Sequence, residues 1–287
     1  MNEELQKLTI ANFPPLLREI PDPPKSLWLR GKLPDFETRK WITVVGTRAY
    51  SPYGKQAVEH LIAGLAGSPV VVVSGLALGI DALAHNAALR AGLPTVAIPG
   101  SGLGWDVLYP RTNYSLGKAI IEEGGAHLSE YAPDFRAQQW SFLQRNRVMA
   151  GIAHATLIIE ATERSGTLVT ARLATDYNRD VMVVPGSIFS ESSKGNHRYL
   201  RHGATPVGSA EDILDVLGIA KEQKKVARAD ISDDEQNVLN ILSSPLPRDE
   251  LIRTLGMPAS ATSSLLSIME LKGLIAESTG YIRSTLQ

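Results

Sequence analysis

The sequence predicts an α/β fold: an extended Rossmann-like, mostly parallel doubly wound sheet with a small C-terminal winged-helix domain. Two observations predict the sheet. From Trp41 to about residue 187, short apolar runs alternate with segments of helical periodicity, and glycine-rich turns separate them. Such runs are typical of strands covered on both faces. A third observation predicts the second domain, because after Lys221 the composition changes and three helical segments and a hairpin follow.

Each element of the predicted sheet has its own signal. A strand is predicted where apolar residues run together, and a helix where they recur at helical spacing. The alternation of the two places helices on both faces of the sheet. The predicted strands are 42–45, 70–73, 95–98, the residues around His127, 155–160 and 180–184. The predicted helices are 53–66, 80–90, 114–122, 141–150 and the segment after Thr167.

The two ends of the chain lie outside this alternation. Prolines punctuate residues 1–40 and disfavour long helices, so we expect an N-terminal segment of short helical and extended pieces that wraps on the main domain, 41–220. The charged residues 221–229 predict a linker. Residues 230–287 predict a winged helix-turn-helix domain.

The predicted winged-helix domain is acidic. Residues 230–287 hold eight acidic and four basic residues, and the third helix, 259–271, contains no Lys or Arg. A recognition helix in duplex DNA normally brings positive charge to the phosphates. We therefore expect this domain to contact protein rather than duplex DNA.

Composition limits the class of protein. The chain has 287 residues, of which 44% are hydrophobic and 21% charged, which excludes a mainly disordered protein. Because cysteine is absent, a disulfide framework, a thiolate metal site and a cysteine nucleophile are excluded, and a cytoplasmic protein is expected. No apolar run reaches the length of about 18 residues that a membrane span requires. With a net charge of −1, any phosphate-binding surface must be a local patch.

Four loops rich in small residues follow predicted strands. Ligands of doubly wound sheets bind beyond the carboxyl ends of the strands, and the N–H groups that begin a helix attract anions. Turn formation alone would explain any one of these loops, but four at one edge favour a phosphate-binding edge. The candidate residues in these loops are Gly46, Thr47, Arg48, Ser74, Gly75, Ser101, Gly102, Ser165, Gly166 and Thr167.

None of these loops has the G-x-G-x-x-G or G-x-x-x-x-G-K-[ST] spacing. The sequence therefore argues against classical dinucleotide binding and P-loop ATP hydrolysis. Metal-ligand spacing is also absent, so neither a cofactor nor a metal site is expected.

Cationic and aromatic residues accompany the loops. Guanidinium groups bind phosphate oxygens and stack on bases, and an aromatic ring stacks on bases too. Each of these arginines could instead form a surface ion pair, and the phenylalanine could belong to the core. A lysine and an asparagine near residue 195 could add a basic contact or lie in a mobile loop. These further candidate residues are Arg111, Phe142, Arg145, Asn146, Arg147, Lys194 and Asn196.

Catalytic residues are not predicted. Asp81 and His85 could form an acid–base pair, but a helix-terminal carboxylate beside a packed histidine explains them better. Glu160, at a strand end, could be a general base, yet no nucleophile is adjacent to it in sequence. We therefore expect a protein that is not an enzyme.

The motifs of the main domain resemble, in order and spacing, the DNA processing protein A family (DprA, also called Smf). The resemblance covers about residues 10–217, and the predicted winged helix is similar to the C-terminal domain of many members. The motifs that carry it are Val44-Val45-Gly46-Thr47-Arg48, Ser74-Gly75-Leu76-Ala77, Gly79-Ile80-Asp81, Ala84-His85, Tyr109-Pro110-Arg111, Ser129-Glu130, Arg145-Asn146-Arg147, the stretch from Ser165 to Ala171 and Val184-Pro185-Gly186-Ser187.

The resemblance implies a sequence-independent binder of single-stranded DNA that forms a homodimer and loads a RecA-type recombinase during natural transformation. Arg48 matches the arginine of the family's Gly-Ser-Arg motif, with Thr47 in place of the commoner serine, and Arg111 stands where members often have lysine. No enzymatic activity is implied. An alternative stays open, a nucleotide-derivative sensor or phosphoribohydrolase-like enzyme, because residues 160–170 loosely resemble the turn and glutamate of cytokinin-activating phosphoribohydrolases.

Overall fold

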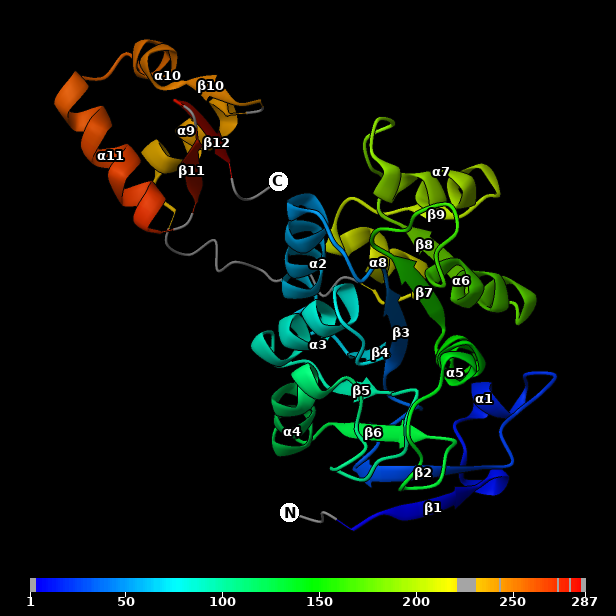
Figure 1. Cartoon of the computed structure of the whole chain (residues 1–287). Helices are drawn as coiled ribbons and strands as arrows, with labels where there is room; N and C mark the ends of the chain where they lie inside the picture. The colour runs from blue at the N-terminus through cyan, green and yellow to red at the C-terminus, as the bar shows by residue number, and fades with distance from the viewer. Residues whose placement is uncertain (1–3, 221–230, 243, 273, 279, 285–287) are drawn as a thin grey trace. The chain divides into compact units, whose positions relative to one another are not determined.

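The structure is a computed structural model that describes residues 4–220, 231–242, 244–272, 274–278 and 280–284 (Figure 1). The chain divides into two compact units, Met1–Lys221 and Glu222–Gln287, and each is described by itself. The predicted linker, 221–229, lies outside the described residues.

A nine-stranded sheet forms the centre of the first unit, with the order β1-β2-β6-β5-β4-β3-β7-β8-β9. The strands from β6 through β3 to β9 run parallel, and β1 and β2 are antiparallel additions at one edge. This arrangement confirms the predicted mostly parallel doubly wound sheet. The strands are β1 (Gln6–Thr9), β2 (Ser26–Gly31), β3 (Lys40–Val45), β4 (Val70–Ser74), β5 (Thr95–Ala97), β6 (Ala126–Ser129), β7 (Ala155–Ile158), β8 (Asp180–Val183) and β9 (Thr205–Pro206).

Helices cover both faces of the sheet (Figure 1). One face carries α2 (Pro52–Gly64), α3 (Ile80–Arg90), α4 (Tyr114–Glu122) and α8 (Ala210–Val216). The other face carries α1 (Pro15–Arg18), α5 (Gln139–Ile152), α6 (Thr167–Asp176) and α7 (Lys194–Arg201). Successive residues of β3 point to opposite faces. Trp41 and Val45 therefore pack in the cluster under α5, and Ile42 and Val44 pack under α2 and α3.

The strand order reverses at β3, which fixes where a ligand can bind. The chain leaves β3 for β4 on one side, and it later returns to β7 on the other side. The loops that follow β3 and β7 therefore diverge and leave a crevice at the carboxyl edge of the sheet, the edge formed by the carboxyl ends of the parallel strands.

The N-terminal segment packs on the main domain and also adds strands to its sheet. Residues 4–40 include α1, a 3-10 turn at Ile10–Asn12 and the strands β1 and β2. Because β2 pairs antiparallel with β6, this segment extends the sheet itself. Leu17 and Leu27 are fully buried and hold it in place.

The second unit has the predicted winged-helix fold. A three-stranded sheet, in the order β10-β12-β11, packs with three helices around a core that includes Val238, Leu251, Leu266 and Met269. The elements are α9 (Asp233–Ile241), β10 (Leu246–Pro247), α10 (Arg248–Leu255), α11 (Ala259–Leu271), β11 (Ile275–Ser278) and β12 (Tyr281–Ser284).

Local sequence explains where the elements of the second unit begin and end. Ser232 caps α9 by accepting a hydrogen bond from the Glu235 N–H, and Glu235 Oε2 accepts one from the Ser232 N–H. Gly256 ends α10 in the left-handed region, with φ 63°. Within the part of the chain that the structure describes, no helix combines the length and apolar character needed to cross a membrane.

Two buried histidines predict a loss of stability at mildly acidic pH. Burial, and secondarily the other histidine, lowers the pKa of His85 to about 3, and burial followed by Arg30 lowers the pKa of His127 to about 3. Because these pKa values lie below that of an unfolded histidine, about 6.5, the unfolded chain binds more protons between the two values. Stability is therefore complete above pH 6.5 and is lost as the pH falls toward 3.

Urea titrations between pH 6.5 and 5, followed by tryptophan fluorescence, measure this loss, since all four tryptophans lie in the first unit. We expect a decrease in unfolding free energy that approaches ~1.4 kcal/mol per pH unit for each histidine. His127→Leu should reduce the slope by that amount, whereas the exposed His60, changed to Gln, should leave it unchanged. Equal slopes for all three proteins would contradict the prediction.

Candidate nucleic-acid interface

A pocket of about 520 Å³ opens where the strand order reverses. Its walls come from the loop after β3, the start of α3, the first turns of α5 and the start of α6. Tyr109, in the connection between β5 and α4, completes the lining. The lining includes charged side chains, such as Arg48 and Asp81, and the aromatic Tyr109 and Phe142.

The polar and apolar sides of the pocket meet at Phe142. The Arg48 guanidinium carbon lies 5.4 Å from the centre of the Phe142 ring, and the Tyr109 ring centre lies 5.6 Å from it. Phe142 is half-buried, whereas Arg48 and Tyr109 are exposed. A side chain at Gly100 would overlap the Phe142 ring, so glycine at 100 allows this placement. The three side chains therefore present a cation and two aromatic faces together.

The start of α6 forms the opposite wall. The Thr167 N–H donates to Ser165 Oγ at 3.1 Å, and the Leu168 N–H donates to the Ser165 carbonyl at 3.1 Å. The Val169 N–H donates to the Gly166 carbonyl. Because of these internal acceptors, the start of α6 has fewer free N–H donors than the sequence predicts for a helix start. The Ser165 hydroxyl also donates to Thr167 Oγ1 at 2.9 Å, so within this pair the hydrogen of the Thr167 hydroxyl is the one left for a ligand.

Arg145 supports the pocket from inside. Its Nη1 donates to the Gly75 carbonyl, at 2.7 Å, and to the Ile98 carbonyl, so it joins the ends of β4 and β5. A side chain at residue 75 would overlap this guanidinium. Asp81 accepts hydrogen bonds from the Gly75 and Ala77 N–H groups. Burial lowers the pKa of Arg145 and raises the pKa of Asp81, while the attraction between the two opposes both shifts.

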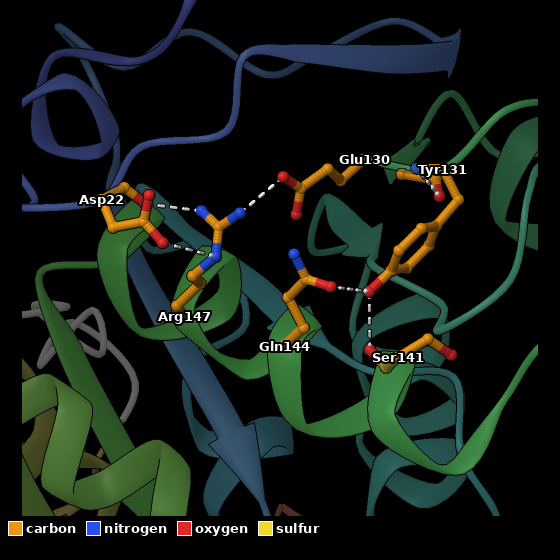
Figure 2. Close-up of polar contacts among 7 residues, drawn as sticks. Asp22, Glu130, Tyr131, Ser141, Gln144 and Arg147 are labelled. Carbon is orange, nitrogen blue, oxygen red and sulfur yellow. Dashed lines mark hydrogen bonds and ion pairs between the residues drawn. The ribbon is translucent and has the colours of Figure 1, made fainter.

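Arg147 does not line the pocket and belongs to a cluster of polar contacts with Asp22 and Glu130 (Figure 2). Its Nη2 donates to Glu130 Oε1 at 2.5 Å, and its Nη1 donates to the Asp22 carbonyl at 2.5 Å. Tyr131 donates to the Ser141 carbonyl at 2.9 Å, and burial raises its pKa to about 12. The cluster fastens the N-terminal segment and the end of β6 to α5. Arg147 is thus engaged with acidic and carbonyl oxygens.

The pocket therefore gathers some of the predicted residues and not others. Those that line it are Gly46, Thr47, Arg48, Phe142, Arg145, Asn146, Ser165, Gly166 and Thr167. Those outside the lining are Ser74, Gly75, Ser101, Gly102, Arg111, Arg147, Lys194 and Asn196.

Internal contacts explain most of the residues outside the lining. Ser74 Oγ donates to the Val44 carbonyl at 2.7 Å, and the buried Asn196 amide donates to the Ile159 and Val184 carbonyls at 2.8 Å. Arg111 lies over the Tyr114 ring, 4.3 Å from its centre. Lys194 begins α7 rather than lying in a mobile loop, and pairs with Glu191 at 2.5 Å.

Sequence reasoning missed an accumulation of exposed apolar side chains at the carboxyl edge. Among the described residues of the first unit, large exposed hydrophobic side chains follow β3, β4, β5, β6 and β8, with Ile10 near β1 as the exception. The sequence could have indicated them, because these large apolar residues stand in predicted loops and at predicted helix starts. These exposed edge residues are Tyr50, Tyr53, Leu78, Tyr109, Trp140, Leu143, Ile188 and Phe189.

The residues weighed for catalysis have structural partners. His85 Nδ1 lies 2.7 Å from Thr95 Oγ1, within the protein. Glu160 is 2% exposed and accepts hydrogen bonds from the Ser51 N–H, the Ser51 hydroxyl and the Ser192 hydroxyl at 2.6 to 2.9 Å. Glu160 does not line the pocket.

The first unit is a doubly wound domain whose pocket, at the point where the strand order reverses, is lined by arginine and aromatic side chains. A winged-helix domain follows it in the chain. This combination is that of the DNA processing proteins. The chain belongs to the family described as DNA recombination-mediator protein A, whose sequence profile matches residues 6–218. The profile of the DprA winged helix domain matches residues 222–280.

Individual relatives agree with this membership. DNA processing protein DprA of Streptococcus pneumoniae is 42% identical over 204 residues, which are 70% of this chain and 70% of the relative. DNA processing protein DprA of Bacillus subtilis is 36% identical over 73% of this chain and 70% of its own length. Protein Smf of Escherichia coli is 34% identical over 94% of this chain and 75% of its own length.

Two solved structures share the fold. DprA of Streptococcus pneumoniae superposes with a TM-score of 0.68 at 37% identity, and the match covers 74% of each chain. DprA of Helicobacter pylori superposes with a TM-score of 0.66 at 31% identity, over 75% of this chain and 96% of that one. The description of the Helicobacter pylori structure concerns its single-stranded DNA binding mode.

The Arg147 cluster predicts a specific loss of stability. Removing one partner of a buried ion pair leaves the other charge without compensation, so Arg147→Ala should lower the free energy of unfolding by about 3 kcal/mol. Arg172, which is 74% exposed and pairs with Asp176 on the surface of α6, is the matched control. Arg172→Ala should cost less than about 1 kcal/mol. Urea denaturation at pH 7 measures both, and equal values would show that the cluster does not hold the N-terminal segment.

Proposed function

We propose that the protein binds single-stranded DNA without sequence preference at the carboxyl edge of the sheet. The observation that carries the proposal is the Arg48 guanidinium over the Phe142 ring, inside the pocket at the switch point. A guanidinium group neutralises a phosphate, and an aromatic ring stacks on an unpaired base. Family membership and the single-stranded DNA binding described for the Helicobacter pylori relative support it.

The same pocket favours unpaired over paired DNA. In a duplex the bases are stacked inside and only the phosphates and groove edges are exposed, so the Phe142 and Tyr109 rings would have no base face to contact. Stacking is also tolerant of sequence, because every base has a π-face. The arrangement therefore suits a strand of any sequence.

We further propose that the bound strand is delivered to a RecA-type recombinase, in natural transformation, by a homodimer of this chain. The family name, a recombination mediator, supports this role. The acidic first turn of α9, Asp233, Asp234 and Glu235, and the absence of Lys and Arg from α11 favour protein rather than duplex DNA as the partner of the winged-helix unit.

Arg48→Ala tests the proposed site. The variant should bind single strands about tenfold more weakly, since a charged hydrogen bond contributes roughly 1.5 kcal/mol. The slope of log K against log salt should decrease by about 0.7, the value for one phosphate contact on a single strand. Fluorescence anisotropy with labelled oligonucleotides at several salt concentrations measures both quantities. The variant should also lose stimulation of strand exchange by a RecA-type recombinase.

Arg90→Ala is the control for this experiment. Arg90 is exposed and pairs with Glu59 at 2.9 Å, and it ends α3, at the opposite edge of the sheet. Its replacement should change neither affinity nor salt slope. If Arg48→Ala and Arg90→Ala behave alike, Arg48 does not contact the strand and the proposed site is wrong.

We also propose that the protein is not an enzyme. A phosphoribohydrolase-like reaction would require a carboxylate that faces the substrate, whereas both Glu160 oxygens accept hydrogen bonds from Ser51 or Ser192 outside the pocket. Incubation with nucleoside monophosphates should therefore release no free base, as chromatography would detect. Release of base that disappears in Glu160→Gln would instead favour the enzymatic alternative.

A further inference from the structure

Phe189 is the most exposed of the exposed edge residues, with 92% of its surface accessible, and its neighbour Ile188 is 74% exposed. Both lie in the connection between β8 and α7, outside the pocket lining. In the sheet, β8 is two strands from β3, which corresponds to about 10 Å between the strand ends. The Phe189 loop, residues 184–190, is therefore near the pocket but distinct from it.

The Phe189 loop is held in place by residues of two helices, α2 and α7. Tyr53, at the start of α2, donates to the Pro185 carbonyl at 2.6 Å, and His197 Nε2 lies 2.9 Å from the Gly186 carbonyl. The Phe189 N–H donates to Ser187 Oγ at 3.2 Å. Because these bonds hold the loop backbone, contact with a ligand would cost the rotamer freedom of the Phe189 side chain but little backbone freedom.

Contacts also continue from this loop to the pocket wall. Directly after the loop, the Ser192 carbonyl accepts from the Ala161 N–H at 2.8 Å, and Ser192 Oγ donates to Glu160. Glu160 and Ala161 begin the connection that leads to Ser165 and the pocket. The surface between Phe142 and Phe189 therefore consists of connections that are fixed to one another.

We propose that Phe189 is a second stacking platform, which contacts a base of the bound single strand beyond the pocket. The proposal rests on the proposed function and deepens it, because it assigns the direction in which the strand leaves the pocket, from β3 across β7 to β8. The exposed Arg164 lies in the intervening connection and can accompany the strand's phosphates.

The surroundings of Phe189 favour a base over a protein partner. A protein interface needs a contiguous patch of about 800 Å² per partner with an apolar centre. Apart from Ile188 and Tyr53, which donates to the Pro185 carbonyl, the neighbours of Phe189 are serines and a charged pair, Ser187, Ser190, Ser192 and Lys194 with Glu191. One ring with an adjacent aliphatic side chain in polar surroundings matches the area of one base.

Phe189→Trp makes the contact observable, because an indole that stacks on a base loses fluorescence. We expect an oligothymidylate of about 20 nucleotides to quench the added emission, and one of about 5 nucleotides, bound at the pocket, to quench it much less. The wild-type protein gives the contribution of its own tryptophans. The control is Ala66→Trp, an exposed position just after α2 at the opposite edge, where no quenching is expected.

Phe189→Ala supplies a second measurement. Affinity for the long oligonucleotide should fall about tenfold, whereas affinity for the short one should stay the same. If Arg48→Ala has its expected effect but Phe189→Trp is not quenched by the long strand, the inference is wrong and the proposed function stands. If no oligonucleotide binds the wild-type protein, the proposed function itself fails. A change of oligomeric mass in Phe189→Ala with unchanged DNA affinity would assign the residue to contacts between chains and overturn the inference.

Discussion

The hydrogen bonds to the Glu160 carboxylate are the constraint on which the carboxyl edge depends. A carboxylate that is 2% exposed has to have its oxygens satisfied, because burial of an unpaired charge is very costly. Here the donors come from Ser51, after β3, and Ser192, after β8, and α2 begins at Pro52 with its positive dipole end beside the charge. Three connections that are distant in sequence therefore have one fixed arrangement.

The two arginines of α5 likewise connect segments that are distant in sequence through buried hydrogen bonds. Arg145 gives its hydrogen bonds to the carbonyl groups that end β4 and β5, and Arg147 gives its own to Glu130 and Asp22. Both side chains are buried, at 6% and 8% exposure, and direct their hydrogen bonds to acceptors inside the protein, so neither guanidinium group is turned to solvent. Arg48, which lies on the exposed side of Phe142, has no such internal carboxylate in contact among the described residues. It is the cation that the pocket presents.

The sequence predicted the parallel sheet and its site edge because both follow from local patterns. Apolar runs and helical spacing place β3 to β8, and the carboxyl ends of parallel strands meet at one edge whatever the strand order. The roles of Arg145 and Arg147 could not be predicted, since their partners Ile98 and Asp22 are 47 and 125 residues away. The strands β1 and β2 were also beyond prediction, because antiparallel edge strands follow no alternation with helices. The domain boundaries and the assignment of the site to DNA stay predictions.

For the proposed function, the near-neutral charge and the apolar edge together favour single-stranded over duplex DNA. A duplex binder obtains much of its affinity from many phosphate contacts, and a chain with net charge −1 and two of its candidate arginines buried has few to make. The exposed edge residues offer aromatic and aliphatic surface instead, and of the two forms of DNA only the single strand has unpaired bases that could stack on it. In the proposed function, selectivity for single strands would arise from stacking, which salt screens weakly, rather than from charge.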